Sequence, residues 1–240
     1  MGELADKLKR YFRFNNDEVV SVLFASFILG FVFVFRDFSF LNLVFGFVIV
    51  LASLVFHVAA QKTFALSQGY YVEFRLWWSG LLVSLMFAFL TNGRIWWIML
   101  PGGVIFSMIA KQRIGKFRYG LNYFPMGWVA FFGPLGSIVF GSIFKNIELY
   151  LIGNAIPWMS SIFVLNLVLA VNTMLPIPPL DGHYMFFASR PWFVILFGTI
   201  FTYSILVAFD VYSWILAIIA GLIIWLVYYL SYEKEAWPVG

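Results

Sequence analysis

Long apolar runs dominate the chain and replace the alternating or one-faced patterns of a soluble fold. A helix rises about 1.5 Å per residue, so about 20 mostly apolar residues are needed to cross a bilayer. Runs of suitable length occupy residues 19–35, 40–61, 126–144, 156–175, 192–209 and 211–230. The pattern therefore predicts about six transmembrane helices.

Two shorter apolar runs, 76–90 and 95–110, lie between the second and third of these spans. Thr91-Asn92-Gly93-Arg94 joins them, and the second run contains Pro101-Gly102-Gly103. The two runs fit either a pair of short helices or a hairpin that dips into the membrane. Either arrangement returns the chain to the side that it left.

The composition supports a membrane protein, because 63% of the 240 residues are hydrophobic and only 11% are charged. Soluble domains carry about 25% charged residues. We expect an all-α polytopic membrane protein forming one integral domain, residues 1–240, with an amphipathic cytoplasmic N-terminus over 1–18. The absence of cysteine excludes thiol catalysis and cysteine zinc sites. The net charge of +4 does not indicate nucleic-acid binding.

The positive charges predict the topology, since Lys and Arg concentrate in cytoplasmic loops. With the N-terminus inside, Arg36, Arg94 and Lys145 are the Lys and Arg residues that fall outside or at a hairpin tip. The others fall inside, which predicts two cytoplasmic termini in a multi-pass protein. They are Lys7, Lys9, Arg10, Arg13, Lys62, Arg75, Lys111, Arg113, Lys116, Arg118, Arg190 and Lys234.

Ionisable groups in spans are costly and mark functional sites. His57 lies near the end of the second span, and Gln61 follows one helical turn later on the same face. The segment from Asn172 to His183 breaks the helix with Pro176, Pro178 and Pro179 before it reaches Asp181. Asp181 either lies beside water or a polar partner in the membrane, or caps the next helix at the interface.

The run from Pro176 to Gly182 resembles the Leu-Asp-Gly motif of the site-2 protease family, the intramembrane zinc metalloproteases, especially its short archaeal and bacterial members. Phe56-His57-Val58-Ala59-Ala60-Gln61 is similar to its His-Glu-x-x-His motif. The stretch 69–77 resembles its segment after that motif, and Gly133-Pro134-Leu135-Gly136 its Gly-Pro-Leu helix start. The resemblance implies a site-2-protease-like core over about 40–187, followed by a C-terminal helix pair over 191–230, in a prokaryotic plasma membrane.

The resemblance implies that two histidines and the aspartate hold zinc, and that the glutamate activates a water molecule. His57 and Asp181 match two of the metal ligands. Gln61 stands in place of the second histidine, and Val58 in place of the glutamate. His183 is a possible replacement nitrogen ligand, if the backbone near the prolines is irregular.

The proline segment also supplies residues that the resemblance places in the substrate cleft. The family has an asparagine three residues before the first proline, where this chain has Thr173, with Asn172 one position earlier. The cleft residues are then Asn172, Thr173, Pro176, Pro178, Pro179 and Gly182.

Three functions remain open at this point. The first is an inactive homologue, a pseudoprotease in regulated intramembrane proteolysis that binds a transmembrane helix or membrane-protein partner as a scaffold. The second is an active, unconventional zinc protease. The third is a transporter or a lipid-handling protein that uses the same polar cleft.

Overall fold

The computed structural model describes residues 3–109, 122–152 and 157–233 of the chain. The described elements, in chain order, are α1 (Glu3–Tyr11), α2 (Asn16–Val34), α3 (Phe40–Ser67), β1 (Tyr70–Leu76), α4 (Trp78–Leu90), β2 (Gly102–Met108), α5 (Tyr123–Ile147), the π-helical turn η2 (Glu148–Ile152), α6 (Pro157–Thr173), α7 (Asp181–Ala188), α8 (Arg190–Ala208), α9 (Trp214–Tyr228) and the π-helical turn η3 (Tyr229–Glu233).

The six predicted spans are confirmed as helices α2, α3, α5, α6, α8 and α9. Five of them are long and apolar enough to cross a bilayer, while α6 has 17 residues and joins α4 as a shorter apolar helix. Helix α3 continues beyond the predicted end of its span, to Ser67. The chain is therefore an integral membrane protein with several spans.

The second short apolar run, 95–110, does not form a helix. Pro101 lacks a backbone donor and Gly102 has a φ of +139°, so an α-helix cannot pass through them. After them, Val104 and Phe106 are buried while Ile105 and Ser107 are exposed, a strand period of two. The strand β2 pairs antiparallel with β1, with Phe74 opposite Val104. Of the two short helices considered for this region, only α4 is present.

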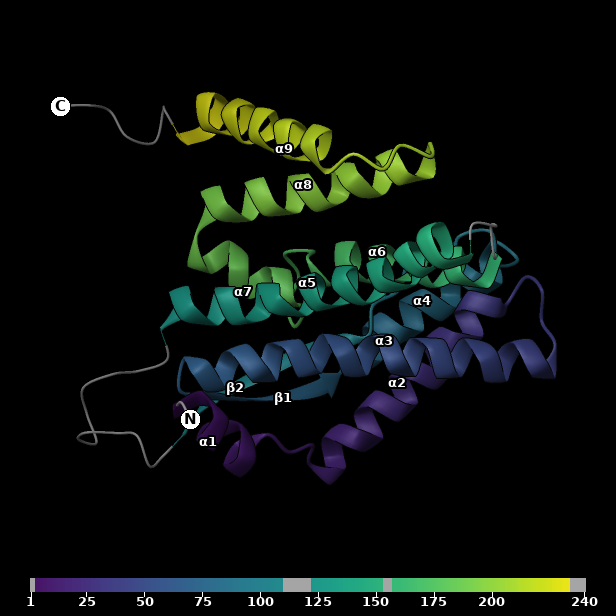
Figure 1. Cartoon of the computed structure of the whole chain (residues 1–240), viewed down its shortest axis with the longest axis horizontal. Helices are drawn as coiled ribbons and strands as arrows, with labels where there is room; N and C mark the ends of the chain where they lie inside the picture. The colour runs from purple at the N-terminus through teal and green to yellow at the C-terminus, as the bar shows by residue number, and fades with distance from the viewer. Residues whose placement is uncertain (1–2, 110–121, 153–156, 234–240) are drawn as a thin grey trace.

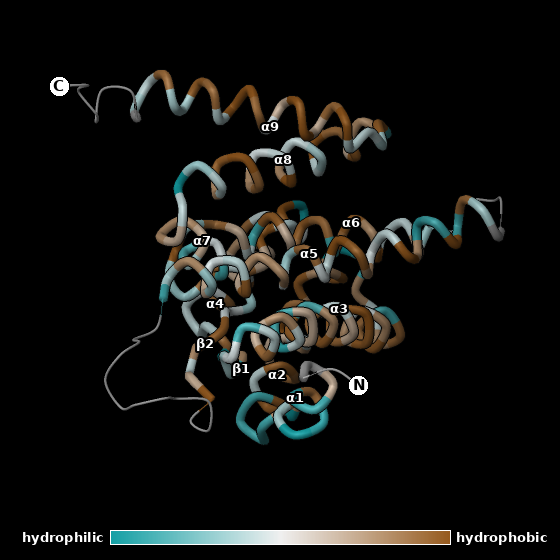
Figure 2. The backbone as a smooth tube through the Cα atoms, turned by 60° about the vertical axis from the view of Figure 1, so that its left-hand side comes forward, coloured by the Kyte–Doolittle hydropathy of each residue, from teal (hydrophilic) through white to brown (hydrophobic). Residues whose placement is uncertain are grey.

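The long helices lie side by side across the molecule, and α9 forms the outermost layer (Figure 1). Helix α5 packs against α3, α6 and α7, whereas α9 packs mainly against α8. Hydrophobic residues make up most of the central helices, and hydrophilic residues gather in α1 (Figure 2). Since α5 touches three neighbours, its side chains reach both α3 and the segment that starts at Asp181.

The described ends of the chain lie at the same end of the helix bundle, because α1 and the last turn of α9 lie on the left of Figure 1. The C-terminal end of α3 and the start of α8 lie at this end as well. These segments carry Lys7, Lys9, Arg10, Lys62 and Arg190. The basic loop expected over 111–118 lies outside the described residues.

A buried ion pair fixes the N-terminal segment to this framework. Glu18, in the capping box of α2, lies 2.8 Å from Lys62 Nζ on α3, and its second oxygen accepts the Phe74 N–H of β1. Lys62 also donates to the Arg13 carbonyl at 2.7 Å. One carboxylate therefore joins α2, α3 and the outer edge of β1.

Candidate functional site

Helix α3 presents His57 and Gln61 on one face, as their spacing predicts, and both are buried. Apolar residues surround them in sequence, so the helix continues without interruption through the pair. Their neighbour is α5, whose backbone comes very close at Gly133. A Cβ atom at Gly133 would lie 2.7 Å from Gln61 Cδ and would also collide with His57 Nε2. Only glycine allows this contact.

Asp181 meets His57 although 124 residues separate them in the sequence. The proline segment ends at Leu180, which occupies the N-cap position of α7, so Asp181 is the first residue of that helix. Its side chain is 1% exposed, and Oδ2 lies 2.8 Å from His57 Nε2. The helix-capping alternative for Asp181 is therefore wrong, and its partner is the histidine on α3.

Ser137 completes the polar group, and the sequence reading missed it. Its Oγ lies 2.9 Å from His57 Nδ1, and the side chain is fully buried on α5. In the tautomer whose Nε2–H donates to the Asp181 carboxylate, Nδ1 is the acceptor and the Ser137 hydroxyl donates to it. The one sequence signal was the position of Ser137, directly after Gly133-Pro134-Leu135-Gly136.

Pro134 explains what Gln61 does. The Gly-Pro-Leu-Gly run lies inside α5 and not at a helix start, so Pro134 removes the N–H that would bond to the Ala130 carbonyl one turn earlier. Gln61 Nε2 donates to that carbonyl at 3.2 Å. Inside a bilayer, a carbonyl freed by proline needs such a neighbour. Gln61 therefore supplies a hydrogen bond to the α5 backbone.

Two acceptor oxygens at this site have no donor among the described residues. They are Gln61 Oε1 and Asp181 Oδ1, and both are inaccessible to solvent. Because the Gln61 amide nitrogen donates to the Ala130 carbonyl, the amide oxygen is the atom left without a hydrogen-bond partner. A water molecule or a cation would satisfy them.

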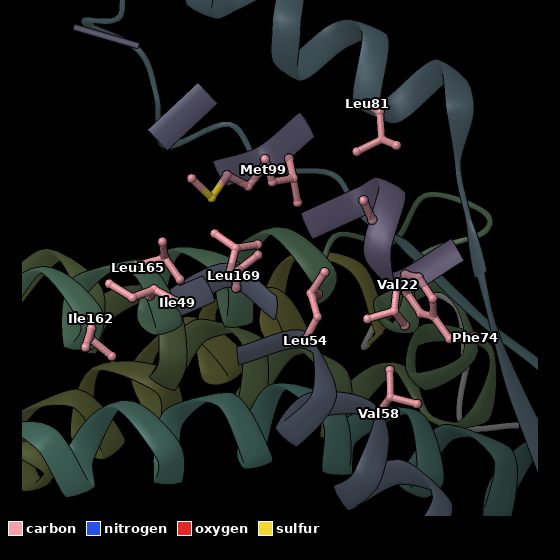
Figure 3. Packing of buried hydrophobic residues seen from close by; sticks show 13 residues of the cluster. Val22, Ile49, Leu54, Val58, Phe74, Leu81, Met99, Ile162, Leu165 and Leu169 are labelled. Atoms are coloured by element: carbon pink, nitrogen blue, oxygen red, sulfur yellow. The ribbon is translucent and has the colours of Figure 1, made fainter. Parts of the chain in front are cut away.

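Val58 stands where the resemblance implies a general base. Its side chain is fully buried in an apolar cluster with Val22, Leu54 and Phe74, which Figure 3 shows around it. Glu73, the acid that follows in the chain, lies on β1 opposite Ile105. Valine accepts no proton, so Val58 cannot act as a general base. The carboxylate that contacts His57 is that of Asp181.

His183 lies on α7, two residues after Asp181, and its ring contacts aromatic side chains. Its ring contacts Phe187, with centroids 4.7 Å apart, and Tyr184, at 5.6 Å. Partial burial lowers the pKa of His183 from its ordinary value. Across residues 3–109, 122–152 and 157–233, no group of three or more His, Cys, Asp or Glu side chains could hold a metal ion.

The predicted cleft residues separate into two groups. Asn172 Nδ2 donates to the Trp97 carbonyl at 2.7 Å and to Val168 at 2.9 Å, and Thr173 Oγ1 bonds within α6. Asn172 lines an apolar cavity of about 620 Å³ between α6, α8 and the 97–100 segment.

The proline loop, the second group, lies against the backbone of the protein. The Pro179 carbonyl contacts Gly103 of β2, and Gly182 contacts the Met174 carbonyl. Pro178 and Pro179 are joined by a cis peptide bond, and Pro176 precedes them in the same loop.

These donors do not fit a zinc centre. Zinc in proteins takes three or four ligands, mostly imidazole nitrogen and thiolate sulfur with some carboxylate oxygen. His57 and Asp181 supply two donors. The other side chains described at the site are the Ser137 hydroxyl, bonded to His57, and the Gln61 amide, whose nitrogen is bonded to α5. An amide oxygen suits hard cations such as calcium or magnesium better than zinc.

Comparison with known proteins identifies a distant relative. The chain is 28% identical over 173 residues to a protein of Methanocaldococcus jannaschii whose name marks it as a candidate zinc metalloprotease. The alignment covers 71% of this chain and 84% of that protein. No protein-family model matches the chain, and no solved structure matches it. This is a membrane protein distantly homologous to a metalloprotease candidate.

Proposed function

We propose that the chain is a non-proteolytic homologue of site-2-type intramembrane proteases, a pseudoprotease that binds a transmembrane segment of another protein as a scaffold subunit. The observation that carries this proposal is the bond from Gln61 Nε2 to the Ala130 carbonyl, 3.2 Å long. Through it, the residue at the second-histidine position supplies a donor to the carbonyl that Pro134 leaves without its helical N–H. The position has thus changed from a metal ligand to a structural residue.

The burial of Val58 supports the same conclusion from a second position. Peptide hydrolysis by a bound water needs a base near the metal, and this help is worth roughly 10²- to 10⁴-fold in rate. Val58 is 0% exposed in the apolar cluster, so the residue serves packing instead. The polar group of Ser137, His57 and Asp181 then holds α3, α5 and α7 together.

The cavity beside Asn172 is the proposed binding place for the partner. Its volume of about 620 Å³ suits several large apolar side chains, and Trp97, Phe197 and Phe201 line it. Membrane helices associate through packing and occasional interhelical hydrogen bonds. A transmembrane segment that inserts side chains between α6 and α8 meets both kinds of contact here.

We place the end of the bundle that holds α1 in the cytoplasm. Lys7, Lys9, Arg10, Lys62 and Arg190 belong to segments at this end, and cytoplasmic loops are enriched in Lys and Arg. Arg36, Arg94 and Lys145 follow or end helices α2, α4 and α5 at the other end.

The second candidate is an active metalloprotease with an unusual ligand set. It is favoured by the unpaired Gln61 Oε1 and Asp181 Oδ1, which a cation between them would satisfy. This candidate needs a further ligand, and His183 would supply it only if α7 rearranged, because its ring contacts Tyr184 and Phe187.

Metal analysis and a restored variant separate the two candidates. We expect the unaltered chain, purified in mild detergent without chelator, to hold far less than one zinc per chain and to cleave no transmembrane segment. We expect Val58→Glu/Gln61→His to gain zinc, since it restores two ligand or base positions. Stoichiometric zinc in the unaltered chain, lost in Asp181→Asn together with cleavage activity, would establish the protease instead.

A further inference from the structure

A second cavity, of about 340 Å³, lies at the end of the bundle opposite to α1 and α7. The cavity lies where the C-terminal end of α5, the C-terminal part of α8 and the start of α9 meet, on the right of Figure 1. Its polar and aromatic lining includes Ser142, Lys145, Asn146, Tyr203, Tyr212 and Trp214. The volume falls in the range of about 300–1,000 Å³ found for small-molecule pockets.

The turn between α8 and α9 fixes two of these walls. Val211 N–H bonds to the Leu206 carbonyl at 2.8 Å and Asp210 N–H to Val207 at 3.0 Å, the bond pattern of a Schellman helix end. Asp210 takes the required left-handed conformation, with a φ of +59°. The turn places Tyr212 and then Trp214 against the cavity, so its aromatic walls exist without a ligand.

Contacts among the lining residues hold the aromatic rings in place. Trp214 stacks on Tyr203 with centroids 3.6 Å apart. The Tyr212 ring lies 5.3 Å from Lys145 Nζ and 6.2 Å from the ring of Phe163. Aromatic side chains of this kind suit the boundary between hydrocarbon and headgroups, where one end is apolar and the other polar.

Lys145 lines the cavity, and two bonds hold its ammonium group. Its ammonium donates to Glu148 Oε2 at 3.1 Å and to Ser160 Oγ at 3.0 Å, and the Ser160 hydroxyl contacts Glu148 in turn. An ammonium has three N–H donors, so one is left for the Tyr212 side of the cavity. The neighbouring groups, Asn146 and Ser142, also carry donors, and none of the lining residues that the structure describes is a carboxylate.

We propose that this cavity binds the phosphodiester of a phospholipid headgroup. Lys145, Asn146 and Ser142 donate to the phosphate oxygens, and the aromatic walls cover the glycerol. The end of α5 and the start of α9 place the cavity at the membrane boundary, the depth at which lipid phosphates lie. Because Glu148 balances the charge of Lys145, a singly charged diester fits better than a doubly charged phosphate monoester.

This proposal is independent of the function proposed for the His57 site, because the cavity lining shares no residue with that site. It is tested by native mass spectrometry of the full chain in detergent with added phosphatidylglycerol. The comparison ligands are a diacylglycerol with the same acyl chains and glycerophosphoglycerol, the water-soluble deacylated headgroup. We expect one phosphatidylglycerol per chain, bound at least about tenfold more tightly than the diacylglycerol.

Two variants test the assignment to this cavity. Lys145→Met/Glu148→Gln removes both charges of the pair, so no unpaired charge remains buried, and Asn146→Leu removes a lining amide. Each is expected to weaken phosphatidylglycerol binding about tenfold, whereas Arg94→Met, an exposed cation at the same end, leaves it unchanged. Equal binding of diacylglycerol, or unchanged binding by both cavity variants, would overturn the proposal. Displacement by glycerophosphoglycerol would support the phosphate site and assign it to a soluble phosphodiester.

Discussion

His57 Nε2 and Asp181 Oδ2 lie 2.8 Å apart in the interior of the helix bundle, with both side chains almost fully buried. Ser137 engages the other ring nitrogen, so the imidazole bonds on both sides. Burying polar groups in an apolar bundle costs free energy, and these two contacts offset part of that cost. The group therefore joins α3, α5 and α7 at a single point.

Loss of the Asp181 carboxylate is expected to destabilise the protein. Asp181→Ala leaves His57 Nε2 without its hydrogen-bond partner, and an unpaired buried polar group costs about 1–3 kcal/mol. The free energy of unfolding, measured in detergent with a denaturant, reports this loss. Asp37→Ala, at an exposed position, serves as the control and should change it little. Equal stability of the two variants would contradict the pairing.

The link between Gln61 and Pro134 is tested by a double-mutant cycle. Gln61→Leu leaves the Ala130 carbonyl without a donor, so we expect a loss of about 1–3 kcal/mol in the free energy of unfolding. Pro134→Ala restores a backbone N–H to that carbonyl. In this background, Gln61→Leu should cost clearly less. If its cost is the same in both backgrounds, Gln61 does not serve the carbonyl freed by Pro134.

Gly133 is expected to accept no side chain. A methyl group there would overlap His57 and Gln61, whose end atoms already bond to Asp181 and Ala130. Gly133→Ala should therefore lower the thermal unfolding midpoint, with a cost of about 1–3 kcal/mol. Gly198→Ala is the matched control, because a Cβ at Gly198 meets its nearest neighbour at 3.4 Å. A harmless Gly133→Ala would show that α3 and α5 are not in close contact here.

The Lys62–Glu18 pair should matter most when only one partner is removed. Lys62→Met leaves Glu18 buried and uncompensated, at a cost of about 3–5 kcal/mol in the free energy of unfolding. Lys62→Met/Glu18→Gln removes both charges and should recover much of that loss. Lys9→Met, at an exposed position on α1, is expected to have little effect. A double variant less stable than Lys62→Met would refute the pairing.

The sequence alone was enough to predict the spans, because lipid solubility is a property of each segment by itself. Every long apolar run became a helix, from α2 near the N-terminus to α9 near the C-terminus. Through the resemblance it also matched His57 and Asp181 to two ligands of one metal site, and it placed Gln61 on the face of His57. The strand β2 escaped prediction, since a short apolar run fits helix and strand alike until a pairing strand is known.

The roles of the individual polar groups were decided by the tertiary structure. That Gln61 bonds to a carbonyl 69 residues away depends on Pro134 freeing that carbonyl and on Gly133 letting α3 approach it. Ser137 reaches His57 across 80 residues for the same reason. Hydropathy determines which segments enter the membrane, but hydrogen bonds inside it depend on which helices touch and how closely. Those contacts arise from packing between distant segments, and no single segment encodes them.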